Sequence, residues 1–368
     1  MHVPGDFTRE EIQARAKITE QILDEVRSAH QKKPLDLFLS YFYNAHFDPA
    51  GFDALRNFGI PSVNFYCNSI YQFENVAEIA RRADFSWHPE RDARDLYLKV
   101  GANPVWVQMG ADPEVYRPIP EIPRKRTACF VGQRYADRDR WLAALDIAAI
   151  PFDLYGQGWN SASIQAEIDT ALLDVSYLGR KRTRVGTFGS YADAVRQNIS
   201  SSGWFTGVAR TLKQWRYRRE TQALTRQTAA HAKGKANDVA RTLAAYEVCL
   251  NFSNVWSDGR PGSALVRHVR LRDFEAPMCR TCYLTGHTDE IAEFYEVGKE
   301  IDTYRTTEEL VDKTHFYLAN AGAAERLRAA GYARARRDHT WVRRFGELFA
   351  KIGVPVPAPK HTTVSVAT

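Results

Sequence analysis

Residues 270–285 read Arg-Leu-Arg-Asp-Phe-Glu-Ala-Pro-Met-Cys-Arg-Thr-Cys-Tyr-Leu-Thr, and this stretch carries the sharpest local signal in the chain. It predicts a helix, the end of a longer helical stretch over residues 265–278, followed by a strand over residues 282–285. A carboxylate such as Glu275 can accept hydrogen bonds from both hydroxyls of a ribose, and an arginine such as Arg272 can neutralise a diphosphate. The simpler interpretation is that these two residues, three apart, form an ion pair on one helix face.

Helices and strands alternate along most of the chain. Helices are expected over residues 8–33, 138–147 and 237–245, and strands over residues 35–42, 60–66, 85–87, 105–108, 128–131, 151–155, 248–252 and 282–285. This alternation is typical of parallel sheets covered by helices on both faces. A proline-rich charged junction near residue 120 interrupts it, so we expect two domains, residues 1–120 and 121–350, and a disordered tail over residues 354–368.

Composition limits the class of protein. The 368 residues are 44% hydrophobic and 26% charged, which is ordinary for a folded protein and excludes collagen-like, coiled-coil and wholly disordered chains. No run of apolar residues is long enough to cross a membrane, and the first residues lack the pattern of a secretory signal. Five cysteines in a chain of this size are typical of a reducing compartment, so we expect a cytoplasmic protein.

A series of motifs follows a characteristic order along the chain. An Arg-x-Phe-Glu helix, a strand of small residues, an acidic helix and a Gly-Lys-Glu-Ile turn stand at residues 272–275, 282–285, 289–294 and 298–301. Upstream, the series includes Phe130-Val131-Gly132, Tyr155-Gly156-Gln157-Gly158-Trp159 and Leu250-Asn251-Phe252-Ser253. Outside a basic segment, most of the chain thereby resembles the CgeB-like (spore maturation protein) glycosyltransferases, relatives of the group 1 transferases with the GT-B fold.

The resemblance implies a GT-B architecture, an α/β fold in which two Rossmann-like doubly wound domains face a cleft. It implies transfer of a sugar from a nucleotide-diphosphate donor to a glycan acceptor, with no further cofactor. Glu275 would hold the ribose hydroxyls, and Arg272, together with Arg270, would stabilise the charge that develops on the leaving diphosphate. The implied donor-binding residues are Gly132, Arg138, Gly156, Asn251, Arg270, Arg272, Phe274 and Glu275. Ordinary turn geometry is an equal explanation for the two glycines.

The chain departs from the family pattern in three respects. Arg267 stands where group 1 relatives often carry a glutamate, Arg280 stands where the family usually has glycine, and the first domain is short. A catalytic base, where one is used, should come from the first domain, and His46 follows its first expected strand at the carboxyl end. These departures keep a second interpretation open, a non-catalytic module that binds a nucleotide or a glycan.

Two other short motifs have simpler explanations. Asp137 and Asp139 match the Asp-x-Asp of metal-dependent transferases of another fold, but they lie at the expected start of a helix, where acidic residues interact favourably with the macrodipole. Cys279 and Cys282 have the spacing of half a zinc site, and no second ligand pair accompanies them in the sequence. We therefore expect helix capping, two buried cysteines and no metal ion.

Positive charge is concentrated in one segment. Residues 180–241 contain 14 Lys or Arg and 3 Asp or Glu, so this segment carries +11 and the rest of the chain −5. We expect a basic helical insertion over residues 180–235 of the second domain. Its basic and aromatic residues over 204–219 suit nucleic acid, a membrane surface or an anionic acceptor, and a solvated insertion explains them as well. Since the rest of the chain resembles a transferase, we favour an anionic acceptor or peripheral contact with the inner face of the membrane, and expect no nucleic acid.

Overall fold

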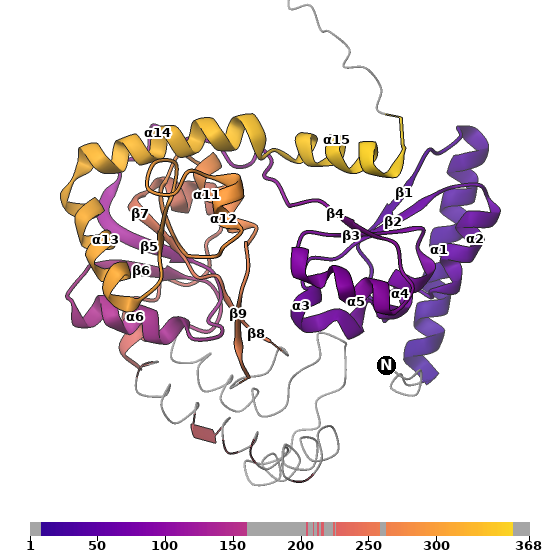
Figure 1. The fold of residues 1–368 in the computed structure, drawn as a ribbon, viewed down its shortest axis with the longest axis horizontal. Coiled ribbons are helices and arrows are strands. Elements are labelled where there is room, and N and C mark those ends of the chain that lie inside the picture. The colour runs from indigo at the N-terminus through magenta and orange to yellow at the C-terminus, as the bar shows by residue number, and fades with distance from the viewer. Residues whose placement is uncertain are drawn as a thin grey trace, which may run out of the picture. The chain divides into compact units, whose positions relative to one another are not determined.

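The computed structural model describes residues 9–159, 226–257 and 263–355, and six single positions between 204 and 224. The chain divides into two compact units, which can be followed by the colour bar of Figure 1. The first comprises Met1–Ser69, Phe73–Gln108 and Trp341–Thr368, and the second Ile70–Gln72 and Met109–Thr340. Each unit contains a parallel sheet with helices, as the predicted α/β class requires. Most of the predicted basic insertion and nearly all of the predicted tail lie outside the described residues.

The first unit contains a sheet of four parallel strands in the order β1-β2-β3-β4. These strands are β1 (Phe38–Ser40), β2 (Ser62–Phe65), β3 (Phe85–His88) and β4 (Pro104–Trp106). The helices are α1 (Arg9–Lys32), α2 (Ala50–Asn57), α3 (Ser69–Gln72), α4 (Ala77–Arg82), α5 (Arg94–Lys99) and α15 (Trp341–Ile352), with single 3-10 turns η2 (Phe73–Asn75) and η3 (Arg91–Ala93). Each strand pairs with the next one in the chain, so the order runs in one direction across the sheet.

The two faces of this sheet are covered by different parts of the chain. Phe52 of α2 and Ile79 of α4 are fully buried on one face, where Leu23 of α1 also packs. On the other face, Leu348 of α15 is fully buried in a cluster with strand residues, among them Trp87. The last helix of the described chain therefore completes the core of the first unit.

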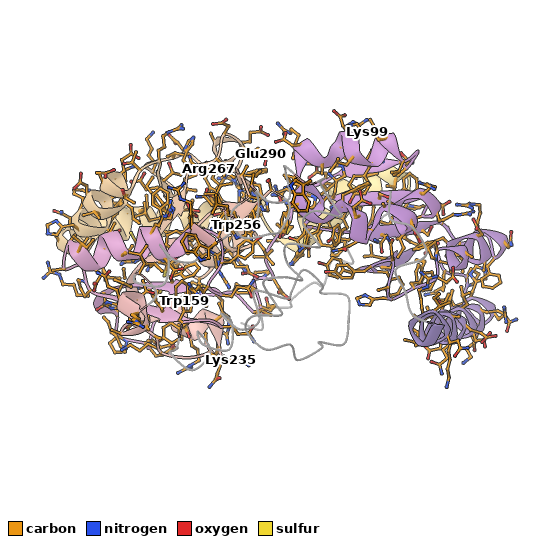
Figure 2. The ribbon with its side chains drawn as sticks, turned by 90° about the horizontal axis from the view of Figure 1, so that it is seen from below. Lys99, Trp159, Lys235, Trp256, Arg267 and Glu290 are labelled. Carbon is orange, nitrogen blue, oxygen red and sulfur yellow. The ribbon has the colours of Figure 1, made fainter. Side chains whose placement is uncertain are left out.

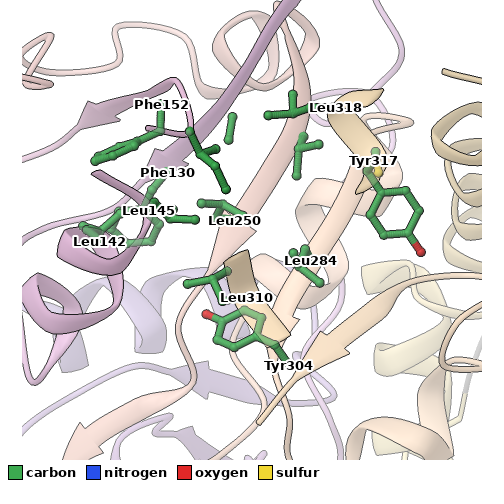
Figure 3. Packing of buried hydrophobic residues seen from close by; sticks show 14 of the residues in the cluster. Phe130, Leu142, Leu145, Phe152, Leu250, Leu284, Tyr304, Leu310, Tyr317 and Leu318 are labelled. Carbon is green, nitrogen blue, oxygen red and sulfur yellow. The ribbon is translucent and has the colours of Figure 1, made fainter. Parts of the chain in front are cut away.

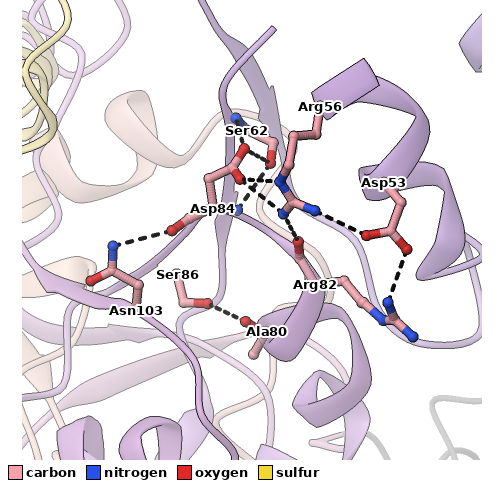
Figure 4. Close-up of polar contacts among 8 residues, drawn as sticks. All are labelled: Asp53, Arg56, Ser62, Ala80, Arg82, Asp84, Ser86 and Asn103. Carbon is pink, nitrogen blue, oxygen red and sulfur yellow. Dashed lines mark hydrogen bonds and ion pairs between the residues drawn. The ribbon is translucent and has the colours of Figure 1, made fainter. Parts of the chain in front are cut away.

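A polar network lies at the amino ends of the strands of this sheet (Figure 4). Asp84, directly before β3, accepts hydrogen bonds from the backbone N–H (2.9 Å) and hydroxyl (2.8 Å) of Ser62, the first residue of β2. Arg56 of α2 donates to Asp84 at 2.9 Å and to Asp53 at 3.0 Å, and Asp53 also pairs with Arg82 of α4. The network fixes two helices to the amino ends of the strands, whereas ligands of such folds bind at the carboxyl ends.

The second unit contains a sheet of five parallel strands in the order β11-β10-β7-β5-β6, and a hairpin of β8 and β9. The strands are β5 (Lys125–Val131), β6 (Phe152–Tyr155), β7 (Tyr246–Asn251), β8 (Asn254–Trp256), β9 (Leu265–Arg267), β10 (Cys282–Gly286) and β11 (Asp302–Tyr304). The helices are α6 (Arg138–Ile147), α10 (Val239–Ala244), α11 (Arg272–Met278), α12 (Ile291–Phe294), α13 (Thr307–Ala319) and α14 (Ala321–Asp338).

Helices cover both faces of the second sheet. One face buries a cluster of side chains from α6, α13 and the strands, among them Phe130, Leu142, Leu145, Phe152, Leu250, Leu284, Leu310 and Leu318 (Figure 3). On the other face, the Tyr283 hydroxyl of β10 donates to Asp273 of α11, and Cys249 Sγ of β7 lies 3.5 Å from the Leu243 carbonyl oxygen of α10. The sheet is therefore the middle of three layers, as expected for a Rossmann-like domain.

The structure corrects one element predicted from the sequence and adds others. Residues 265–278 are not one helix, because Leu265–Arg267 is strand β9 and α11 begins only at Arg272. Residues 265–267 pair with β8 across a hairpin, and this non-local pairing outweighs the local helical pattern. The short strands β8 and β11 were not expected, whereas the helix predicted over residues 138–147 is confirmed as α6.

Candidate functional site

The carboxyl ends of β5 and β7 mark the point where the order of the second sheet reverses. From β5 the chain passes outward to β6, and it then returns to the other side of β5 to form β7 and the strands beyond it. The connections leave these two neighbouring strands in opposite directions, and ligands of open α/β sheets bind at such a switch point. The side-chain amide of Asn254, which follows β7, donates to Asp137 Oδ2, which follows β5, at 2.7 Å. This bond joins the two sides of the switch point.

Arg138, the first residue of α6, is a buried arginine at this point. Its side chain is only 5% exposed, and its guanidinium lies 5.1 Å above the ring of Phe130. One guanidinium nitrogen donates to the Gln133 carbonyl oxygen, whereas Nε is buried without a hydrogen-bond partner, and no carboxylate in the described part of the chain is within ion-pair distance. Burial, and then the charge of Arg270, lower the pKa of Arg138 to about 9. The charge of neighbouring Asp137 only partly offsets these effects, and a buried cation without an ion-pair partner is costly, so Arg138 is suited to receive an anion.

Arg270, in the loop before α11, contributes a second positive charge. Its Nη1 lies 2.7 Å from Nε2 of His268, which is buried. Burial, and then the charge of Arg270, hold the pKa of His268 well below its usual range, so the imidazole is neutral and can accept this hydrogen bond. Because the charge of Arg270 also lowers the pKa of Arg138, the two guanidiniums share one positively charged region.

Asp273, which belongs to none of the predicted binding residues, anchors the Arg270 loop. Its side chain is fully buried and accepts hydrogen bonds from the backbone N–H of Arg270 (2.6 Å), the Tyr283 hydroxyl (2.8 Å) and the Thr285 hydroxyl (2.9 Å). Burial raises the pKa of Asp273, and these hydrogen bonds oppose that rise. Asn251, predicted to bind the donor, donates its amide to Asp273 at 3.2 Å. The only sequence signal for Asp273 was an acidic residue in the first turn of a buried helix.

Arg272 and Glu275 form the ion pair that the simpler interpretation predicted. Arg272 Nη1 lies 2.7 Å from Glu275 Oε2, and the two side chains are 21% and 8% exposed. Tyr116 lies beside this pair. Burial, and then the charge of Glu275, raise the pKa of its hydroxyl. The charge of Arg272 is therefore already balanced, whereas Arg138 and Arg270 have no ion-pair partner among the residues that the structure describes.

Gly132 and Gly156 are required by contacts within the protein. A Cβ at Gly132 would lie 2.6 Å from the ring of Phe130, and a Cβ at Gly156 would lie 2.4 Å from the Gly132 carbonyl oxygen. Gly156 also has a φ of +131°, which side-chain-bearing residues rarely adopt. The ring of Phe130 therefore accounts for Gly132, and close approach of the two strand ends accounts for Gly156, both without a ligand.

Phe274 and His46 are the two remaining predicted residues. Phe274 is fully buried, with its ring centroid 5.5 Å from that of Phe294 and 5.2 Å from that of His339. His46 belongs to the first unit, where it is exposed and meets Tyr43 edge to face at 4.9 Å. Their predicted roles in donor binding and as a base stay predictions.

Asp137 and Asp139 lie at the start of α6 as expected, but with different partners. Asp137 occupies the N-cap position and does not accept a hydrogen bond from the helix backbone, so the expected capping bond is absent there. Its Oδ2 instead accepts from Trp141 Nε1 at 2.9 Å. Asp139 pairs with Arg134 at 2.9 Å and accepts from the Thr228 hydroxyl at 3.3 Å. Over the described residues, no group of three or more His, Cys, Asp or Glu side chains is placed to hold a metal ion.

The residues around the second half of α11 are structural. Cys279 and Cys282 are buried as expected, and burial raises the pKa of both thiols. Arg280 has a φ of +57°, which explains why glycine suits this position, and its guanidinium pairs with Glu325 of α14. Because Arg280 precedes β10, it lies at the amino end of the sheet and not at the switch point.

Arg267, the other departure from the family pattern, lies on the β8–β9 hairpin. It is exposed and stands directly opposite Asn254 in the antiparallel register. Figure 2 labels it together with Trp256 of the same hairpin. Directly opposed residues share one face of a two-stranded sheet, so Arg267 adds a positive charge on the face from which Asn254 bonds to Asp137.

Two α/β units of this kind are the architecture of the GT-B glycosyltransferases. The sequence profile of the family described as glycosyl transferase-like matches residues 134–350. This match covers more than half of the chain, and the chain belongs to this family, which falls among the group 1 glycosyltransferases. Among curated proteins, none matches the chain significantly.

Solved structures share the fold at low sequence identity. The Anabaena protein Alr3699/HepE, solved in complex with UDP, is 12% identical with a TM-score of 0.54, and the match covers 91% of this chain and 81% of that one. The sucrose-phosphate synthase of Thermosynechococcus elongatus is 13% identical with a TM-score of 0.52, covering 92% and 80%. A glycosyltransferase from Rickettsia africae is 9% identical with a TM-score of 0.52, covering 95% and 83%. Within the part of this chain that is described, no helix is both long and apolar enough to cross a membrane.

Proposed function

We propose that the protein transfers a sugar from a nucleotide-diphosphate donor to a glycan acceptor, and that the donor binds at the switch point of the second unit. The observation that carries the proposal is Arg138, a cation that is 5% exposed and has no carboxylate partner among the described residues. Membership of the glycosyl transferase-like family supports the reaction class. The UDP complex of the Anabaena protein supports a nucleoside diphosphate as the common part of the donor.

The charges near the switch point suit the leaving group of such a reaction. As the bond from the anomeric carbon to the phosphate oxygen breaks, negative charge develops on the diphosphate. Arg138 and Arg270 can stabilise that charge, and the first turn of α6 adds the positive end of its dipole. Glu275 is proposed to accept the ribose hydroxyls with the lone pairs that its ion pair leaves available. Arg272 would then position this carboxylate through the 2.7 Å contact between them.

The remaining parts of the proposal rest on the sequence. We propose that the enzyme needs no divalent metal ion, that His46 acts as the base if the reaction uses one, and that the acceptor is an anionic or membrane-associated glycan attracted by residues 204–219. The closer kinship with the CgeB-like proteins and a cytoplasmic site of action, at or near the inner face of the membrane, are proposed on the same basis. The sparse cysteines, free in the described structure, agree with a reducing compartment.

To test the donor site, binding of UDP, GDP, dTDP and CMP to the protein and to Arg138→Gln is measured by calorimetry and by thermal shift, with and without Mg²⁺. We expect one nucleotide to bind without metal, and the variant to bind it about tenfold to a hundredfold more weakly, because a hydrogen bond to a charged group is lost. Arg280→Gln is the matched control, since Arg280 is an arginine of the same unit that pairs with Glu325 and lies at the amino end of β10.

Two outcomes would contradict the proposal. Equal nucleotide affinity of Arg138→Gln and the unmodified protein would remove the diphosphate site from the switch point. Nucleotide binding without hydrolysis or transfer of any matching sugar nucleotide, across a panel of glycan acceptors, would favour the non-catalytic binding module. Nucleotide release during turnover can be measured directly and distinguishes the two functions.

A further inference from the structure

Asp137 has an unsatisfied carboxylate oxygen at the switch point. The residue is 8% exposed. Its Oδ2 accepts hydrogen bonds from Trp141 Nε1 (2.9 Å) and Asn254 Nδ2 (2.7 Å), whereas Oδ1 is buried and has no partner within the described structure. A buried acceptor that gives up its water without gaining a donor is costly. A ligand that supplies a donor to Oδ1 would remove this cost.

The neighbouring Arg138 has a buried hydrogen-bond donor that lacks an acceptor in the described structure. This donor is Nε, and the side chain is also more than nine-tenths buried. One helix start therefore presents an unsatisfied donor and an unsatisfied acceptor on consecutive residues. A bare phosphate would satisfy Arg138 and be repelled by the carboxylate of Asp137. The pair instead suits a ligand that has an anionic oxygen and a hydroxyl close together.

The order of the polar groups across the sheet indicates which part of the donor carries this hydroxyl. Glu275 lies on α11, which bonds to β7 and β10 through Asp273, and the same aspartate holds Arg270. Arg138 follows β5 and shares the positive region of Arg270, and Asp137 adjoins it. A nucleotide sugar presents ribose, diphosphate and sugar in sequence. With the ribose at Glu275 and the diphosphate at the arginines, the group at Asp137 is the sugar.

We infer that Asp137 Oδ1 accepts a hydrogen bond from one hydroxyl of the transferred sugar and thereby selects donors that carry this hydroxyl. The inference rests on the proposed function, and it assigns the first aspartate of the Asp-x-Asp a role in recognising the sugar rather than a metal ion. Asp139 does not share this role, because Arg134 and Thr228 already engage its carboxylate. Sugar selectivity then depends on a carboxylate that Trp141 and Asn254 hold in a fixed orientation.

The decisive variant is Asp137→Asn. Its amide oxygen can keep the hydrogen bonds from Trp141 and Asn254, while its NH₂ replaces the unsatisfied Oδ1 with a donor, so the shape is retained and the hydrogen-bonding polarity is reversed. Asp139→Asn is the matched control, two residues away on the same helix. Circular dichroism and the thermal melting temperature show whether each variant is folded.

The experiment measures the affinities of all three proteins for UDP, for UDP-glucose and for its 2-, 3-, 4- and 6-deoxy analogues, with the corresponding nucleotide replacing UDP if the panel above selects another. We expect Asp137→Asn to bind UDP at least as tightly as the unmodified protein, because a negative charge beside the diphosphate is removed, and to bind UDP-glucose at least about tenfold more weakly. For one deoxy analogue the ratio of the variant's affinity to that of the unmodified protein should equal the ratio measured with UDP, because the hydroxyl that distinguished the two proteins is absent. Asp139→Asn should discriminate among the analogues as the unmodified protein does.

The outcomes that overturn the inference differ from those that overturn the proposed function. If the unmodified protein binds none of the nucleotides, the donor site itself is wrong. If it binds UDP and Asp137→Asn weakens UDP as much as UDP-glucose, Asp137 recognises the nucleotide and not the sugar. If the variant and the unmodified protein respond alike to every deoxy analogue, Asp137 makes no contact with a sugar hydroxyl.

Discussion

The two sheets of this molecule differ in the order of their strands, and the candidate site follows that difference. In the first unit the order β1-β2-β3-β4 advances in one direction, whereas in the second unit it reverses between β5 and β7. At the reversal, loops that diverge are joined by the bond between Asn254 and Asp137. Strand order in the second unit therefore creates a place where side chains from two loops meet, at the position where open α/β sheets bind their ligands.

The side chains after the strands differ as well. After β1 and β2 of the first unit stand aromatic residues, with Tyr41 and Tyr43 in edge-to-face contact at 5.6 Å and Tyr41 44% exposed. After β5 of the second unit stands the buried cation Arg138, which has no ion-pair partner among the described residues. Parallel sheets thus leave the choice of chemistry to the loops at their carboxyl ends, and here one sheet presents aromatic rings and the other positive charge.

The largest expected effect concerns one glycine in each unit, Gly156 after β6 and Gly59 after α2. Gly156→Ala should reduce the free energy of unfolding by about 4 kcal/mol, because its Cβ would lie 2.4 Å from the Gly132 carbonyl oxygen at a φ of +131°. Gly59→Ala in the first unit should cost only about 1 kcal/mol, since its φ is +76° and no atom lies within 4 Å of the added Cβ. Urea denaturation measures both. Equal losses would mean that the strand ends of the second unit are not tightly packed.

The next effect concerns His88, the buried neutral histidine of the first unit. Burial, and to a lesser extent Arg94, lower the pKa of His88 to about 4, so the folded protein keeps the imidazole neutral while the unfolded chain protonates near pH 6.5. Stability should be full above about pH 6.5 and decline toward pH 4, with a loss of about 2.5 kcal/mol at pH 4.5. Urea denaturation of the protein and of His88→Gln between pH 7.5 and 4.5 checks this. The variant should lose less stability than the parent over this range, and parallel pH profiles would contradict the assignment.

The smallest effect concerns two hydrogen-bonded aspartates, Asp273 of the second unit and Asp84 of the first. Asp273→Asn should weaken nucleotide binding about tenfold, because the Arg270 loop loses a charge-assisted hydrogen bond of 2.6 Å. Asp84→Asn, at the amino edge of the first sheet, should lower stability and leave nucleotide affinity unchanged, although Asp84 is bonded to Arg56 and Ser62. Calorimetric titration with the nucleotide separates the two. Loss of affinity in Asp84→Asn would show that the amino edge also supports the site.

Elements that depend on local pattern were predictable from the sequence. The run over residues 128–131 is apolar and ends at a glycine, and β5 ends at Val131. Helix α6 has the predicted bounds. The strand at 265–267 was missed because it forms by pairing with residues 254–256, which show no periodic pattern of apolar residues. The reversal of strand order in the second unit was implied by the doubly wound architecture of the resembled family, whereas no local pattern encodes it.

The candidate site was predictable in its residue types but not in their pairing. Arg138 and Arg270 were named from the sequence, yet only the structure distinguishes them from Arg272, whose charge Glu275 balances. Asp273 was overlooked, since an acidic residue at a helix start has a ready explanation in the helix dipole. The same explanation hid Asp137, whose significance lies in one oxygen without a partner in the described structure.

Helix α15 has a consequence for the order in which the chain folds during its synthesis. The strands of the first sheet leave the ribosome early, but Leu348, which covers one of their faces, follows only after the whole second unit. Domains of a nascent chain usually fold from the N-terminus onward. Here the second unit can complete its core first, while Val63, Trp87 and Val105 stay open to solvent or to a chaperone until the last helix arrives. The unit that is translated first is the one that finishes folding last.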